Sequence, residues 1–308
     1  MNPAVILGSD ALHVRIDPSH GGEVIDLVAL GSGRQLLGRP PFASARARAG
    51  DLDEETWTRS YRGGWQLLTP NAGAACNVTG RHHGFHGRAS NDPWEVMEHD
   101  HATVSLRWTG HGLTVERRFS VTGPTLYSDV CCTAETRTPL VAVEHLALGI
   151  EVLDPEVEIT LPAGRAAEMS EHEGGPGGPQ DAPQWPEIAL ADGSSENGQR
   201  WPLSLERSRL VCVRDVPAGW ARVANGRTGA GVALAWDVER LPHLWMWHEI
   251  RRSGGPWRGK TELLVVEPAS VPQHLGLAQA IAEGQASWAE PGRPFAYRMS
   301  VTALPGDG

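Results

Sequence analysis

Apolar and polar residues alternate in short runs along most of the chain, and Gly, Pro, Asn and Asp separate these runs. Alternation with a period of two is typical of β-strands, whereas the helical period of about 3.6 is scarce here. The pattern predicts strands at residues 11–16, 23–28, 94–98, 103–108, 113–121, 126–134, 140–148, 157–161, 210–213, 231–236, 244–250 and 262–267. So many short strands favour an all-β fold built as a large antiparallel sandwich.

Two stretches depart from this alternation. Residues 162–202 are dense in Gly, Pro, Ser and acidic side chains, and a loop of that length is usually functional or disordered. We expect a loop-rich insertion there, over one rim of the sandwich. Residues 271–283 carry spaced apolar side chains among alanines and precede Gly284, which predicts a short helix ended by a glycine cap. No other break resembles a linker, so we expect a single domain over residues 1–308.

Composition narrows the classes of function. The chain of 308 residues has 27 Lys and Arg against 37 Asp and Glu, a formal net charge of -10. Nucleic-acid binding relies on clustered cations that release counterions, so we expect no nucleic-acid partner. No apolar run approaches the roughly 20 residues needed to cross a bilayer, and the first residues lack the features of a signal peptide. We therefore expect a soluble cytoplasmic protein without a membrane partner.

The four cysteines, Cys76, Cys131, Cys132 and Cys212, show no C-x-x-C spacing. Neither a zinc site nor a disulfide framework is therefore expected. The densest group of versatile side chains is the run RHHGFHGR at residues 81–88. These histidines have two other possible roles: they could lie in a solvated loop without a function, or they could bind a metal. No Asp, Glu or Cys nearby completes a ligand spacing, so we predict no bound metal.

Two further titratable residues lie on predicted strands. The period of two places His145 on the same face as Val143 and Ala147, so its ring should point inward. Glu267 shares a face with Val265 at the end of a strongly apolar strand, where partial desolvation would raise the pKa of its carboxyl toward that of a general base. The alternatives are a satisfied core histidine and a strand-end glutamate in an ion pair.

Tryptophan accounts for 12 of the aromatic residues, and the run LWMWHEI at residues 244–250 holds two of them. Indole faces stack on the CH surfaces of sugar rings, although core packing is the more common role of any single Trp. Trp247 and His248 are both candidates for binding substrate. They point to opposite faces of the strand, so only one of them can line a given site.

Several segments together resemble the aldose 1-epimerases, or galactose-mutarotase-like proteins. The segments that carry the resemblance are HGRASNDPWEV at residues 86–96, EHLALG at 144–149, LVVEPA at 264–269, the closing AEG at 282–284 with PGR at 291–293, and the early GGEVIDL at 21–27. They follow one another in the order of the family's motifs. The resemblance implies an antiparallel sandwich of the galactose-mutarotase type, a monosaccharide substrate and no cofactor.

By family position, the resemblance implies that Glu267 takes the proton from the anomeric hydroxyl and that His145 gives a proton to the ring oxygen. His86 would orient the ring-oxygen side. Two positioned proton transfers of this kind, each contributing roughly 10²–10⁴-fold, reach a useful rate without covalent chemistry. Anomer interconversion is therefore the expected reaction. Glycoside cleavage or elimination on the same fold, and a non-catalytic carbohydrate-binding module, remain alternatives.

The resemblance also implies an arginine that holds sugar hydroxyls, and Arg62 beside a Gly-Gly turn is preferred for that role over Arg59. Asp237, after an apolar strand, is a further candidate for binding hydroxyls, with a turn residue as the alternative. Familiar members of the family have Gly where Arg88 follows the His-Gly pair. This departure indicates a divergent branch, and it favours a substrate with an anionic group.

Overall fold

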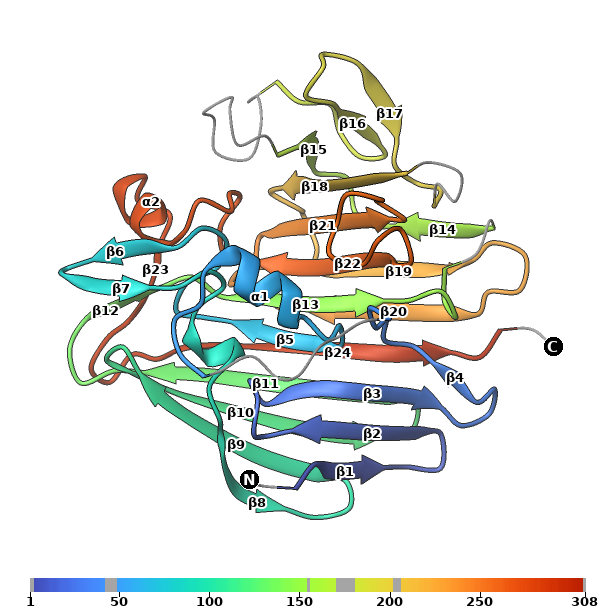
Figure 1. The fold of residues 1–308 in the computed structure, drawn as a ribbon. Helices are drawn as coiled ribbons and strands as arrows, with labels where there is room; N and C mark the ends of the chain where they lie inside the picture. Colours follow the sequence, from blue (N-terminus) through green and yellow to red (C-terminus); the bar gives the residue numbers. More distant parts are fainter. Residues whose placement is uncertain (1–2, 42–48, 154–155, 170–180, 202–205, 307–308) are drawn as a thin grey trace.

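The computed structural model describes residues 3–41, 49–153, 156–169, 181–201 and 206–306. About 50% of the described residues are in strands and 6% are in helices, and two large sheets lie face to face (Figure 1). Every pairing within the two large sheets is antiparallel except that of β15 with β16. The predicted all-β antiparallel sandwich is confirmed.

The 12-stranded sheet carries the features that matter for the site. Its strands, in spatial order, are β1 (Val5–Gly8), β2 (Leu12–Asp17), β3 (Glu23–Ala29), β5 (Trp65–Leu68), β13 (Val143–Leu148), β22 (Glu262–Ala269), β21 (His243–Ile250), β18 (Arg207–Arg214), β15 (Arg165–Glu168), β16 (Glu187–Ala189) and β17 (Ser195–Asn197), with β4 (Arg34–Gln35) beside β3. The central strands β13, β22 and β21 are buried on both faces, as their continuous apolar runs require.

The 8-stranded sheet forms the other layer. Its strands, in spatial order, are β14 (Val157–Thr160), β19 (Trp220–Asn225), β20 (Gly231–Trp236), β24 (Phe295–Leu304), β11 (Thr125–Thr133), β10 (Leu113–Thr122), β9 (Thr103–Gly110) and β8 (Glu95–His99). Smaller elements are the pair β12 (Thr138–Leu140) with β23 (Ser287–Ala289), the hairpin β6 (Cys76–Val78) with β7 (Arg81–His83), helices α1 (Glu54–Ser60) and α2 (Leu277–Ala282), and the 3-10 turn η1 (Arg88–Ser90). Neither α1 nor α2 is long enough to cross a membrane, and the described residues contain no other α-helix.

Two apolar clusters lie on opposite faces of the 12-stranded sheet. The larger one fills the space between the sheets and includes Leu146 of β13 and Val266 of β22. The second lies on the outer face and includes Val143 and Val265 from the same two strands, covered by Trp57 of α1. In Figure 1, α1 lies across this outer face, over β5 and β13. The alternation read from the sequence thus separates a sandwich core from a second, smaller core.

All twelve predicted strands overlap observed ones, with differences at the edges. The stretch 140–148 contains the end of β12 and all of β13 rather than one strand. The predicted helix at 271–283 is shorter, because α2 begins only at Leu277, after the N-cap Gly276. In the expected insertion, the described residues form β15, β16 and β17 and extend the 12-stranded sheet. Its glycine-proline run at 173–179 lies outside the described residues.

Candidate active site

A cavity of about 600 Å³ opens on the outer face of the 12-stranded sheet, beside α1. Its lining comes from segments far apart in the sequence. The lining residues are Glu54, Trp57, Thr58, Gly73, Ala74, Phe85, His86, His145, Glu168, Met169, Ser208, Arg209, Leu210, Trp245, Trp247, Arg252, Glu267, His274 and Leu275. The volume suits a ligand the size of a monosaccharide. All three residues predicted to be catalytic, Glu267, His145 and His86, contribute to this one surface.

Strand register brings the central pair together. β13 and β22 are antiparallel neighbours, and Val143 lies opposite Ala269 while Leu146 lies opposite Val266. His145 is therefore across from Glu267, and both side chains point to the outer face. The distance from His145 Nε2 to Glu267 Oε2 is 3.9 Å, and both side chains are only 3% exposed.

Burial shifts the pKa values of this pair in opposite directions. It raises the pKa of the Glu267 carboxyl well above its usual range and lowers the pKa of His145 to about 3. Among the described residues, no group donates a hydrogen bond to Glu267 that would offset its desolvation. The resemblance implies an ionised Glu267 and a protonated His145, whereas burial by itself favours the uncharged acid and the neutral imidazole.

His86 has a strained backbone and a defined tautomer. Its φ of 61° lies in the left-handed region, an uncommon conformation for a residue with a side chain that often marks a functional site. Its Nδ1 accepts a hydrogen bond from the backbone N–H of Gly73 at 3.0 Å, so the neutral ring carries its proton on Nε2. Burial, with the neighbouring His145 and His274, lowers the pKa of His86 well below its usual value. His86 is therefore suited to donate a hydrogen bond rather than to carry charge.

The glycine after His86 allows this geometry. A Cβ on Gly87 would lie 2.6 Å from the carbonyl oxygen of Thr69 and 2.7 Å from that of Asn71, and φ at Gly87 is +70°. Only glycine fits so close to the backbone of the loop after β5. The His-Gly pair noticed in the sequence thus has a structural basis.

Aromatic rings form one wall of the cavity. Trp57 of α1 meets the ring of His86 edge-on, with centroids 4.4 Å apart, and it stacks on Tyr61 at 5.0 Å. Trp247 of β21 lies on the same face and donates a hydrogen bond to Ser208 Oγ at 3.1 Å. The prediction that Trp247 faces the site agrees with this placement. Such rings could stack on a sugar.

Two arginines are among the lining residues. The side chain of Arg209 of β18 is 5% exposed, and its guanidinium pairs with Glu196 and contacts His248 on the other face of the sheet, so it does not point into the cavity. Arg252, in the loop between β21 and β22, also lines the cavity, and it is exposed. No group of three or more His, Cys, Asp or Glu side chains within the described ranges could hold a metal ion.

The structure does not bring Arg62 or His248 to this cavity. Arg62 pairs with Asp17 at 3.1 Å and with Glu23, in a polar network between β2, β3 and β5. His248 points to the other face of β21, where its Nδ1 lies 3.3 Å from Arg209 Nε, and burial lowers its pKa to about 3. As the alternation required, only Trp247 of the two β21 candidates lines the cavity.

Arg88 and Asp237 also lie outside the cavity lining. Arg88 Nε donates to Asp92 Oδ2 at 2.9 Å, an ion pair one helical turn apart. Asp237 follows β20 in the 8-stranded sheet and accepts a hydrogen bond from the N–H of Glu239, which makes it a turn residue. The cavity lining therefore includes none of four residues predicted to bind substrate, namely Arg62, Arg88, Asp237 and His248.

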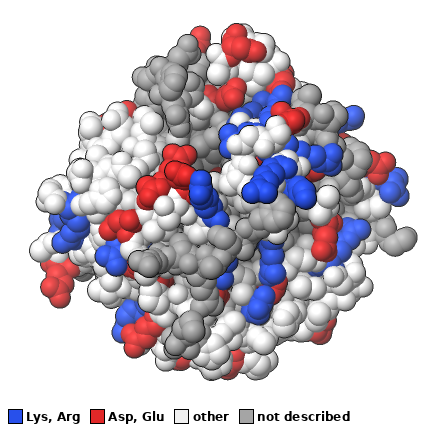
Figure 2. Space-filling view, viewed as in Figure 1, with Lys and Arg blue, Asp and Glu red and all other residues white. Residues whose placement is uncertain are grey.

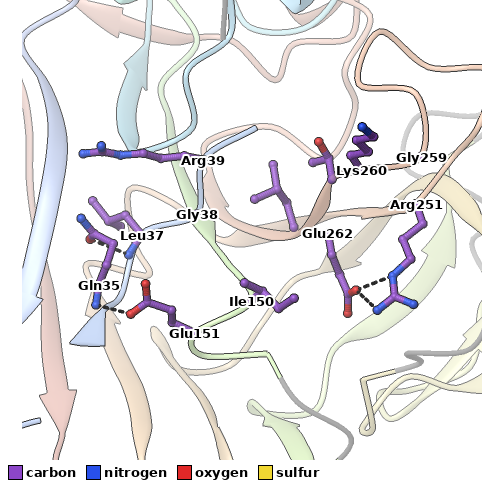
Figure 3. A pocket seen from close by; sticks show the side chains of 12 residues that line it. Gln35, Leu37, Gly38, Arg39, Ile150, Glu151, Arg251, Gly259, Lys260 and Glu262 are labelled. Carbon is purple, nitrogen blue, oxygen red and sulfur yellow. Dashed lines mark hydrogen bonds and ion pairs between the residues drawn. The ribbon is translucent and has the colours of Figure 1, made fainter. Parts of the chain in front are cut away.

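A second cavity, of about 510 Å³, lies at the far end of β13 and β22 (Figure 3). Arg251 and Glu262 pair across one side of it, and Glu151 accepts from the backbone N–H of Gln35 on the other. Its lining includes no histidine among the described residues. Acid and base side chains are brought face to face in the first cavity, which is therefore the candidate active site.

The sequence does not predict the lining residues Trp57 and His274, nor Tyr61, which contacts His145 from behind the cavity. Helix α1, which carries Trp57 and precedes Tyr61, was not predicted. A signal for it exists, because Asp53 accepts a hydrogen bond from the N–H of Thr56 and two glutamates follow in the first turn. His274 has no comparable signal, since it lies in an irregular segment before α2.

On the face that Figure 2 shows, basic and acidic side chains are interspersed. The protein is thus an antiparallel sandwich whose outer cavity holds a buried carboxylate and an imidazole that face one another. No protein-family model matches the chain, and no curated protein matches it significantly in sequence.

Solved structures, by contrast, match over nearly the whole chain. The Slr1438 protein from Synechocystis sp. PCC 6803 aligns with a TM-score of 0.70 and 16% identity, covering 99% of this chain and 96% of that one. A galactose mutarotase related enzyme from Lactobacillus acidophilus aligns with a TM-score of 0.68 and 11% identity, covering 98% and 97%. A galactose mutarotase-like protein from Lactobacillus casei ATCC 334 gives 0.61 and 14%, covering 97% and 99%. The chain has the galactose-mutarotase-like fold, as the sequence resemblance predicted.

Proposed function

We propose that the protein is a cofactor-independent aldose 1-epimerase that interconverts the anomers of a sugar by opening and closing its ring. One observation carries the proposal: Glu267 and His145 face each other at 3.9 Å inside a cavity of monosaccharide size. A base and an acid so placed can act on the two oxygens bound to the anomeric carbon, O1 and the ring oxygen. His86 lies beside them, with its ring centroid 5.7 Å from that of His145.

The proton balance of this reaction matches the chemistry of the pair. Glu267 as carboxylate takes the proton of the anomeric hydroxyl while protonated His145 gives its Nε2 proton to the ring oxygen. The C–O bond of the ring breaks and an aldehyde forms. Rotation about the C1–C2 bond exposes the other face of the carbonyl, and closure returns both protons to their original sites.

Burial stabilises the protonation states of Glu267 and His145 that follow ring opening. Ring opening converts an ionised carboxylate and imidazolium into a carboxylic acid and a neutral imidazole, with no change in net charge. Burial stabilises those uncharged forms, since it raises the pKa of Glu267 and lowers that of His145. The mutual attraction of the two charges, at 3.9 Å, supports the starting state. The pair can therefore hold one proton in either arrangement.

The substrate class follows from the walls of the cavity. Trp57 and Trp247 can stack on a pyranose or furanose ring, and the Nε2–H of His86 can donate to a sugar oxygen. Arg252, an exposed residue of the cavity lining, supports a sugar with an anionic substituent. Arg88, which suggested such a substituent from the sequence, is engaged by Asp92.

Anomer exchange measured by NMR over a panel of neutral and anionic aldoses tests the proposal. We expect exchange above the spontaneous rate for at least one sugar, and a loss of roughly 10²–10⁴-fold in kcat/KM for Glu267→Gln. Glu116→Gln is the matched control, because Glu116 is an exposed residue of β10 in the other sheet. Binding without exchange would indicate a carbohydrate-binding module. Exchange that survives in Glu267→Gln would refute the assigned base.

A further inference from the structure

Tyr61 is buried behind the proposed acid and does not line the cavity. It follows α1 directly, is 2% exposed, and its ring stacks on Trp57 with an interplanar angle of 21°. Its hydroxyl lies 3.4 Å from His145 Nδ1, the ring nitrogen that does not face Glu267. Tyr61 is thus placed to act on substrate only through His145.

The Nδ1 atom of His145 keeps its proton in both states of the proposed reaction. The imidazolium carries a proton on each ring nitrogen, and after it gives up the Nε2 proton the neutral ring keeps the one on Nδ1, so Nδ1–H is a donor throughout. A buried donor or acceptor left without a partner costs about 1–3 kcal/mol. A hydroxyl oxygen can accept a hydrogen bond from Nδ1–H in both states, and it thereby holds the neutral ring in the tautomer whose Nε2 is free to take the proton back.

We propose that Tyr61 is a positioning residue whose hydroxyl accepts a hydrogen bond from His145 Nδ1–H in both protonation states, so that the proton exchanged during catalysis moves only at Nε2. This inference rests on the proposed epimerase function for its kinetic consequences. The hydrogen bond itself is a property of the free protein, and it can be measured without substrate.

The other titratable and polar side chains around His145 do not replace this hydroxyl. Glu267 approaches from β22 on the Nε2 side, and His86 approaches from the segment between β7 and η1 with its own Nδ1 committed to Gly73. Gln66, opposite His145 on β5, donates to Glu23. Burial and the charge of Glu267 raise the pKa of Tyr61 well above its usual value, so the phenol keeps its proton throughout the working range.

Tyr61→Phe removes the hydroxyl and keeps the ring that stacks on Trp57. We expect kcat to fall about 10–100-fold with KM for the sugar nearly unchanged, as for loss of a hydrogen bond to a charged group. Without an acceptor for Nδ1–H the imidazolium is disfavoured, so the basic limb of the pH–rate profile should move to lower pH. Tyr127→Phe, in β11 of the other sheet, is the matched control and should leave kcat and both limbs unchanged.

A spectroscopic measurement separates this inference from the proposed function. In protein labelled with ¹⁵N-histidine, the wild-type Nδ1 resonance of His145, assigned with His145→Gln, should be that of a hydrogen-bonded nitrogen. Tyr61→Phe should shift it, and Tyr127→Phe should not. If wild-type protein exchanges no anomers but the resonance responds as expected, the epimerase assignment fails and the Tyr61 contact stands. A resonance and a pH–rate profile that are both unchanged in Tyr61→Phe would overturn the inference.

Discussion

Two buried glutamates on neighbouring strands have opposite environments. Glu144 of β13 points between the sheets, is 0% exposed, and accepts hydrogen bonds from Trp65 Nε1 at 2.6 Å, Arg117 Nη2 at 2.6 Å and Tyr297 OH at 2.9 Å. Glu267 of β22 points to the outer face and is 2% exposed, and its ionisable partner in the described structure is His145 at 3.9 Å.

The difference shows how burial has two distinct outcomes for a carboxylate. Around Glu144, a cation and two neutral donors satisfy the charge, so the group has a structural role. Around Glu267, desolvation is not offset by donors, and the free energy of its charged form is high. A buried carboxylate with few partners, in a cavity, is a candidate for proton transfer. Burial alone does not distinguish the two cases, whereas the hydrogen-bond partners do.

Glu144→Gln should give the largest loss of stability. Removing the charge leaves Arg117 buried, with its side chain 0% exposed and uncompensated, and breaking such a pair costs about 3–5 kcal/mol. Urea unfolding of the variant and of wild-type protein measures the difference. Glu116→Gln is again the control, because its exposed pair with Arg107 is worth about 0–1 kcal/mol. An unchanged urea midpoint for Glu144→Gln would remove the contrast between the two glutamates.

Arg62→Gln should give an intermediate loss of stability, and it tests whether Arg62 has a structural role or binds substrate. Its guanidinium serves Glu23, whose side chain is 0% exposed, so we expect about 1–3 kcal/mol of lost stability. KM for the sugar should stay the same, because Arg62 does not line the cavity. A raised KM with unaltered unfolding would instead return Arg62 to the substrate-binding role predicted from the sequence.

Glu267→Gln should have the smallest effect on folding, and its sign should depend on pH. The pKa of Glu267 is raised in the folded state, so its contribution to stability is most favourable below the unfolded value of about 4.3 and is lost as pH rises through the folded pKa. The variant should therefore be more stable than wild-type protein at alkaline pH and similar to it near pH 4. Thermal melts across that range check the sign. A variant less stable at pH 8 would show that donors satisfy Glu267 after all.

The sequence predicts the central strands because their nearly continuous apolar runs fit strands that are buried on both faces. It places His145, Glu267 and Trp247 correctly with respect to the faces of their strands, since period two fixes which side each residue occupies. The sequence indicates His86 through its His-Gly pair. Gly87 is required there because its φ is positive and the backbone of Thr69 and Asn71 leaves no room for a side chain. These distant segments come together because β13 and β22 are neighbours in the sheet. The family resemblance implies this strand order, whereas periodicity alone does not predict it.

Arg62 and Arg88 lie beside motifs that the resemblance singles out, but each is paired with a carboxylate outside the cavity. Arg88 pairs with Asp92, four residues further on, whereas the partners of Arg62 depend on tertiary structure. For Arg62 the partners come from β2 and β3, tens of residues away in sequence. Tyr61 is not predicted from the sequence because the helix before it has only seven residues, too few to show a helical period. Its contact with His145 Nδ1 also depends on tertiary structure, which periodicity does not give.

Glu144 and His145 are adjacent on β13 and point to opposite faces of the sheet, so the correct strand register is needed both for stability and for the proposed activity. A shift of β13 by one position would turn an imidazole toward Arg117 and a carboxylate toward Glu267, placing two like charges in the cavity and none beside the arginine. A molecule misassembled in this way would be both unstable and inert. Single-residue deletions between β12 and β13 should therefore abolish soluble protein rather than yield folded, inactive material, and expression trials would show which occurs.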